Sequence, residues 1–252
     1  MNSKLGYYTM RLAIVLFVTL GFVSGIATRS QAQVTNLSNG GTINFSALNQ
    51  TALSVQIGDK LFSNFAFSYI DTDGNNGDDL SSSALVLSSL SNGVGFGVSI
   101  QLPLVATGTT IKDITLQFSA TVLDPNRKIS DVHLDFTGSA SGNGLAEVSE
   151  SIFTNGFGVG NIANLSLSRT VAGFIPPNGE DTAIFGTPQT KIWIEKDIFV
   201  SGNPNAISDG NPPSDFATIT IVNQTLSQIP EPSTIVLALA GLSSFVFLRR
   251  RK

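Results

Sequence analysis

The sequence contains no cysteine and very little of two other residue types that often carry chemistry. Without cysteine, thiol catalysis, disulfide bonds, cysteine-ligated zinc or iron–sulfur centres and a lipoprotein anchor are all excluded. Histidine occurs once, as His133, and tryptophan once, as Trp193. Any Ser-His-Asp arrangement must therefore use His133, and no nucleophile-elbow sequence accompanies it.

Charge is also scarce, and its two signs are unevenly distributed. Charged residues make up 13% of the chain. Between residues 33 and 229 there are seven basic and seventeen acidic residues, which leaves that segment a net charge of −10. Because nucleic-acid binding depends on Lys and Arg neutralising phosphates, we exclude nucleic acid as a partner.

Residues 1–32 have the organisation of a secretory signal peptide. Lys4 and Arg11 precede a twelve-residue apolar run, 12–23, which small and polar residues follow. The run is too short for a bilayer core, which needs about 20 residues, so an uncleaved anchor is the weaker interpretation. Small residues at Ser30 and Ala32 favour cleavage after Ala32, and Ala27 offers a second site. We therefore expect the Sec translocon and signal peptidase as partners.

The C-terminal residues 230–252 combine three features in a fixed order. Pro230, Glu231, Pro232 and Ser233 are followed by an apolar, uncharged segment that continues to residue 248, and then by Arg249, Arg250, Arg251 and Lys252. As a helix, residues 233–248 would extend about 24 Å, which is short for a permanent membrane span. The basic cluster should stay cytoplasmic, with the Pro-Glu-Pro side outside.

This arrangement resembles the PEP-CTERM sorting signal of Gram-negative bacteria. The resemblance implies a single transmembrane helix, recognition by an exosortase, and association with exopolysaccharide or biofilm. It also implies anchoring in the inner membrane before processing, followed by release to the cell surface or extracellular matrix. A plain tail anchor is the alternative, and the sequence leaves open whether the tail is cleaved or retained.

The segment 33–229 is dominated by period-two alternation of apolar residues. Three unbroken runs are Val94, Phe96, Val98, Ile100 and Leu102; Ile114, Leu116, Phe118, Ala120 and Val122; and Val132, Leu134 and Phe136. Such patterns place one face of a strand in a core and the other in water. No stretch of a dozen residues has helical periodicity, and turn residues separate the runs. We predict one all-β domain, an antiparallel β-sandwich of jelly-roll type.

The resemblance extends into this segment at residues 58–70, 192–198 and 222–228. These stretches are similar to a recurrent type of PEP-CTERM exoprotein that has no assigned activity. The family therefore supplies no catalytic residues, and we predict none.

Two polar groupings could hold a metal ion. Asp131, His133 and Asp135 alternate along one strand, but side chains two apart lie about 6.5 Å from each other and converge poorly on one ion. A denser acidic turn contains Asp71, Asp73, Asn75, Asp78 and Asp79. It begins like an EF-hand loop but lacks the glycine and the bidentate glutamate that complete one. A solvated turn is the simpler interpretation; Ca²⁺ is the cofactor it would hold, and otherwise we expect none.

Trp193 and a few carboxylates are the remaining candidates for binding or catalysis. Trp193 lies between two isoleucines, so it would be exposed as a platform for sugars if they are buried. If the strand is buried on both faces, Trp193 belongs to the core, and a core or half-buried position is the simpler interpretation. Glu195 and Lys196 are expected to be surface charges on the same strand. Glu147 and Glu150, three apart, should face opposite ways, so they cannot form the paired carboxylates of a glycoside hydrolase.

The leading hypothesis is a non-enzymatic protein of the cell surface or extracellular matrix, associated with polysaccharide. A carbohydrate-binding module, with or without calcium, is the alternative. A polysaccharide hydrolase is a third and weaker one.

Overall fold

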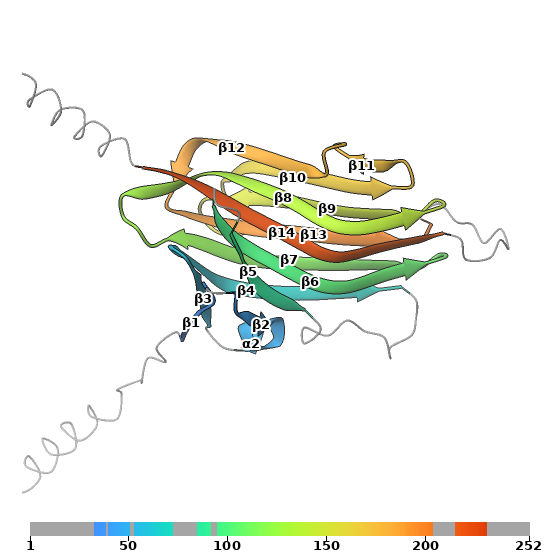
Figure 1. The fold of residues 1–252 in the computed structure, drawn as a ribbon, viewed down its shortest axis with the longest axis horizontal. Coiled ribbons are helices and arrows are strands. Elements are labelled where there is room, and N and C mark those ends of the chain that lie inside the picture. The colour runs from blue at the N-terminus through green and yellow to red at the C-terminus, as the bar shows by residue number, and fades with distance from the viewer. Residues whose placement is uncertain are drawn as a thin grey trace, which may run out of the picture. The chain divides into compact units, whose positions relative to one another are not determined.

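The computed structural model describes residues 33–38, 40–50, 53–72, 85–91, 95–203 and 215–230, which form two β-sheets (Figure 1). The predicted signal peptide, residues 1–32, and residues 231–252 of the predicted sorting signal lie outside the described residues.

The larger sheet has eight strands. In spatial order these are β1 (Val34–Asn36), β3 (Ser54–Ile57), β4 (Lys60–Asp71), β7 (Ile111–Val122), β13 (Lys191–Ser201), β9 (Leu145–Phe153), β10 (Asn161–Thr170) and β11 (Gly173–Ile175). Every neighbouring pair is antiparallel except β1 with β3.

The smaller sheet has six strands and is antiparallel throughout. Its order is β12 (Glu180–Gln189), β8 (Arg127–Ser141), β14 (Phe216–Pro230), β6 (Phe96–Thr107), β5 (Val86–Ser91) and β2 (Thr42–Asn44). One helix is present among the described residues, α2 (Phe45–Gln50), and it buries Phe45 and Leu48 against the core. No helical periodicity in the sequence predicts so short a helix.

The chain crosses from one sheet to the other at most of the connections between its strands. The strands β6, β7, β8 and β9 alternate between the sheets, and β12, β13 and β14 do so again. Such crossing is typical of double-sheet jelly rolls. The predicted antiparallel β-sandwich is therefore confirmed.

The core lies between the two sheets and follows the predicted alternation. On β7, the side chains of Ile114, Leu116, Phe118 and Ala120 are fully buried and Val122 nearly so. On β8 and β6 the inward residues are again the predicted ones, although Phe96 is only half-buried against the core and Val94 lies outside the described residues. Each buried large apolar side chain contributes about 1.5–3 kcal/mol relative to exposure.

Strand β4 departs from strict alternation at a β-bulge. Its pairing with β7 shifts register between Ser63 and Ala66, and Asn64 has a φ of 58°. Asparagine adopts this left-handed conformation more readily than most residues. The extra residue lets both Phe62 and Phe65 point inward, where they would otherwise lie on opposite faces.

Candidate functional site

The outer face of the eight-stranded sheet carries a polar furrow across β7, β13 and β9. Its volume is about 370 Å³, and it is lined by Asp113, Thr115, Ser149, Ser151, Glu195 and Asp197. The furrow forms because the inward positions of these strands are apolar, so the alternate, outward positions bring hydroxyls and carboxylates together. Pairing places Thr115, Asp197 and Ser149 side by side across the three strands.

Two carboxyl groups, Asp113 and Asp197, interact within the furrow. Partial desolvation in the furrow is the largest cause that raises the pKa of Asp197, to about 6, and a hydrogen bond and the charge of Asp113 add to it. Asp113 Oδ1 is buried and has no hydrogen-bond partner among the described residues. This buried oxygen is therefore incompletely compensated within the described part of the chain.

We expect Asp197→Asn to stabilise the protein at pH 7. The pKa of Asp197 in the folded protein lies above its ordinary value of 3.8, so ionisation costs stability as pH rises through about 6. Asparagine removes that cost, and the gain should disappear below about pH 4, where both states of Asp197 are protonated. Because the side chain is exposed, solvent screening limits the gain to about 1 kcal/mol or less. Urea unfolding at pH 4 and pH 7 would measure it; an equal effect at both would contradict the assignment.

Glu195 occupies the next outward position of β13 and is held in place. Gln117 Nε2 of β7 donates a hydrogen bond to Glu195 Oε2 at 2.5 Å. The amide therefore orients one carboxylate oxygen and leaves the other available at the edge of the furrow.

Trp193 is half-buried on the same outer face, since Ile192 and Ile194 are fully buried as the prediction required. The ring of Phe157 meets it edge-on, with centroids 4.9 Å apart. Lys191 Nζ lies 4.0 Å from the centroid of the tryptophan ring, a cation–π geometry. The ring is thus packed against two neighbours, and its role in sugar binding stays a prediction.

Asp71 is the one member of the predicted calcium turn that the structure describes. It accepts a hydrogen bond from Tyr69 Oη at 2.7 Å and pairs with Lys112 Nζ at 3.0 Å. Burial is the largest cause that raises the pKa of Tyr69, to about 12, and the hydrogen bond to Asp71 is the second. Asp73, Asn75, Asp78 and Asp79 lie outside the described residues. Within the described part of the chain, no three His, Cys, Asp or Glu side chains are grouped to hold a metal ion.

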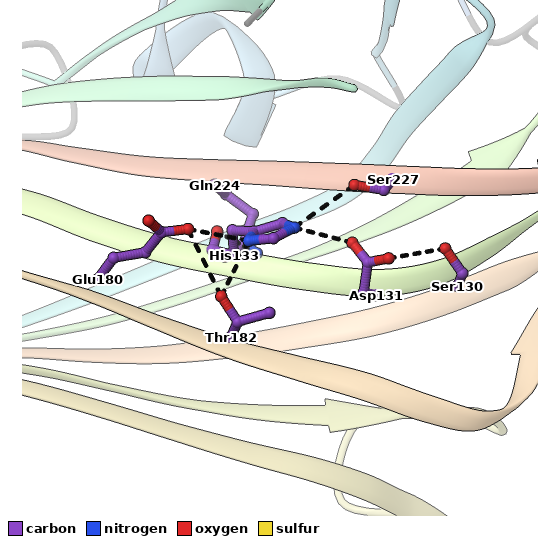
Figure 2. A network of polar contacts seen from close by, with 7 residues as sticks. All are labelled: Ser130, Asp131, His133, Glu180, Thr182, Gln224 and Ser227. Atoms are coloured by element: carbon purple, nitrogen blue, oxygen red, sulfur yellow. Dashed lines mark hydrogen bonds and ion pairs between the residues drawn. The ribbon is translucent and has the colours of Figure 1, made fainter. Parts of the chain in front are cut away.

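His133 lies in a hydrogen-bonded network on the outer face of the six-stranded sheet (Figure 2). Its Nδ1 is 2.9 Å from both Glu180 Oε1 and Thr182 Oγ1 of β12. Its Nε2 is 2.9 Å from Asp131 Oδ1 and 3.4 Å from Ser227 Oγ. These partners were not predicted from the sequence, because β12 and β14 are distant from His133 along the chain.

The network does not have the arrangement of a hydrolytic triad. Ser227, His133 and Glu180 follow the serine–histidine–acid order of such a triad. However, Asp131 is nearer to His133 Nε2 than the Ser227 hydroxyl is. The nitrogen that would accept the serine proton is therefore engaged by a carboxylate. Asp135 does not join the network: it accepts a hydrogen bond from Asn223 Nδ2 at 2.7 Å, and burial raises its pKa.

Lys196 is not a surface charge, and the prediction that placed it there is wrong. Its side chain is 0% exposed, as is that of its partner Glu150. Alternation from Ile192 and Ile194 continues through position 196, which puts Lys196 on the inward face of β13. Glu150 points inward on β9, away from Glu147, as the three-residue spacing predicted.

The Pro-Glu-Pro motif begins where the folded core ends. Strand β14 continues to Pro230, which lies opposite Arg127 in the pairing with β8. The other predicted sorting residues, from Glu231 to Lys252, lie outside the described residues. None of the helices within the described ranges has the length and apolar character needed to cross a membrane.

The described residues thus define an all-β sandwich protein with a polar furrow on one sheet. Residues 228–252 match the family described as the PEP-CTERM protein-sorting motif, so the chain carries this motif at the end of the folded core. The motif marks an exported substrate of an exosortase that is held at the membrane and then processed at the surface.

Comparison with solved structures returns several β-rich proteins at low similarity. TmCBM61 in complex with β-1,4-galactotriose has a TM-score of 0.29 and 10% identity, covering 67% of this chain and 90% of its own. The family 32 carbohydrate-binding module of C. perfringens NanJ, in complex with galactose, has a TM-score of 0.22 and 13% identity, covering 64% and 93%. A structure of accessory secretory protein 1, 2 and 3 in Streptococcus pneumoniae has a TM-score of 0.28 and 9% identity, covering 55% and 88%. No curated protein matches the sequence.

Proposed function

We propose that this protein is a non-enzymatic component of the cell surface or extracellular matrix that binds polysaccharide. The observation that carries the proposal is the furrow on the eight-stranded sheet, where carboxylates, hydroxyls and an amide gather on an exported protein. Sugars present hydroxyl groups that both donate and accept hydrogen bonds, and such side chains match them.

The charge of the furrow defines the class of polysaccharide. Asp113, Glu195 and Asp197 supply acceptors, and no basic side chain lines the furrow. Anionic polymers would be repelled by this concentration of negative charge. The proposed ligand is therefore a neutral polysaccharide whose hydroxyls donate to the carboxylates.

We propose binding rather than hydrolysis for this furrow. Glycoside hydrolases act through two carboxyl groups about 5–10 Å apart, so cleavage of a bound polymer is the outcome that would favour that alternative. Calcium is not needed for this mode of binding, because the polar side chains contact the sugar directly.

We expect Asp197→Ala to weaken binding of a neutral hexose polymer by about 10-fold or more, since a hydrogen bond to a charged group contributes about 1.5–3 kcal/mol. The measurement is retention of the full-length protein on immobilised neutral and uronic-acid polysaccharides, with dissociation constants from titration. Asp131→Ala, a carboxylate on the opposite sheet, is the matched control and should bind normally. Equal retention of both variants, stronger binding to the uronic-acid polymer, or cleavage of the polymer would contradict the proposal.

A further inference from the structure

Three polar side chains meet in the centre of the apolar core. Lys196 of β13 lies directly opposite Glu150 of β9 in the eight-stranded sheet. Gln224 of β14 reaches them from the six-stranded sheet. All three residues are buried, so water has no access to the group.

The hydrogen bonds point the amine of Lys196 at both partners. Lys196 Nζ donates to Glu150 Oε2 and to Gln224 Oε1, the latter at 2.5 Å. Gln224 Nε2 in turn donates to the backbone oxygen of His133 at 3.1 Å, which fixes the amide plane; Figure 2 shows Gln224 beside His133. Glu150 Oε1 is buried and has no partner among the described residues.

The desolvation cost of an ion pair in this position is only partly offset by its hydrogen bonds. Removing two charges from water costs several kcal/mol per ion, and one oxygen of Glu150 stays unpaired. Burial accordingly lowers the pKa of Lys196 and raises that of Glu150, opposed by their mutual attraction. The environment therefore favours a neutral amine, which is the nucleophilic form of lysine, next to a carboxyl group that can move protons.

We propose that Lys196 forms an amide cross-link with the side chain of Gln224 and so joins the two sheets covalently. Lys196 Nζ attacks Gln224 Cδ, and a new carbon–nitrogen bond forms as the bond from Cδ to Nε2 breaks. Glu150 accepts a proton from the attacking amine and delivers it to the departing nitrogen, which leaves as ammonia. The reaction is an amide exchange that needs no oxidant, cofactor or second protein.

The distances are compatible with this attack. A carbonyl bond is about 1.23 Å long, so Gln224 Cδ lies no more than about 3.7 Å from Lys196 Nζ. Positioned groups at about this separation react far faster than free ones. The surrounding side chains are fully buried and apolar, and they exclude water that would compete for the electrophile: Val148, Ile152, Ile194, Ile198, Val222 and Leu226.

Two considerations favour Gln224 over Glu150 as the electrophile: which strands or sheets the new bond would join, and which molecule would leave. Condensation with Glu150 would expel water and would connect two strands that the sheet ladder already joins. Exchange at Gln224 releases ammonia and connects sheets that otherwise meet only through side chains. In an exported chain without cysteine, this bond would take the place of a disulfide.

The test is peptide mapping of the full-length protein after complete denaturation. Trypsin cleaves after an unmodified Lys196 and releases the short peptide 192–196. We expect this peptide to be missing and replaced by one that begins at residue 192, continues past residue 224 and is lighter by one ammonia. Recovery of 192–196 in full yield, with no ammonia loss, would overturn the proposal. A product lighter by one water, in which residues 129–169 and the peptide from residue 192 are joined, would assign the bond to Glu150 and overturn the role of Gln224.

Variants test whether formation of the cross-link depends on the side chains of Glu150 and Gln224. Glu150→Gln keeps the shape of the side chain but cannot move the proton, so the 192–196 peptide should be recovered. Gln224→Leu removes the electrophile and should have the same result. Lys60→Arg is the matched control, because Lys60 is also buried, at 1% exposure, and takes no part in the group. This variant should keep the cross-link, and loss of the link in it would contradict the assignment.

Discussion

Glu150→Ala is expected to lower the free energy of unfolding by about 3–5 kcal/mol, because it leaves Lys196 buried without its charged partner. The neighbouring change Glu147→Ala removes an outward-facing carboxylate on the same strand and should cost about 0.5 kcal/mol or less. Urea unfolding of the full-length protein and of both variants would measure the difference.

The double variant Glu150→Leu with Lys196→Met shows whether the loss comes from an unpaired buried amine. Neither this variant nor Glu150→Ala can form the cross-link. Replacing both partners by apolar residues of similar size removes the desolvation cost, so the double variant should be more stable than Glu150→Ala. A loss below about 1 kcal/mol in Glu150→Ala would contradict the burial of this pair.

Glu231→Ala, or deletion of residues 249–252, is expected to leave export across the inner membrane intact and to abolish processing of the tail. The export signal lies at the other end of the chain, whereas the Pro-Glu-Pro motif and the basic cluster belong to the matched sorting segment. The mass of the protein in membrane and extracellular fractions would report both steps.

A charge-preserving variant is the control for the basic cluster. Arg249→Lys, Arg250→Lys and Arg251→Lys together keep the positive charge that the positive-inside rule requires, so processing should continue. Normal processing in both Glu231→Ala and the deletion would rule out recognition by an exosortase.

The folded core continues up to the first residue of the motif. Strand β14 is the inner strand between β8 and β6, and it carries the chain to Pro230. Its last residues pair with Lys128 and Arg127 at the start of β8.

The sequence was sufficient for features that depend on local pattern. Alternation on β7 and β8 specified the inward residues, because a strand places successive side chains on opposite faces. The sorting motif was also readable, since its parts are contiguous. The bulge at Asn64 could not be predicted from the sequence, because one inserted residue reverses the faces of a strand without changing its composition.

The tertiary structure alone decided what the polar residues do. Lys196 and Glu150 each follow the inward alternation of their strands, but Lys196 was predicted to be a surface charge. Their contact joins positions 46 residues apart. The furrow likewise exists only because β7, β13 and β9 are neighbours in the sheet. The sequence by itself determined that an acidic, cysteine-free β-sandwich carries a sorting tail. Which polar groups meet depended on strand order and on the packing of the two sheets, because those contacts join residues that are distant along the chain.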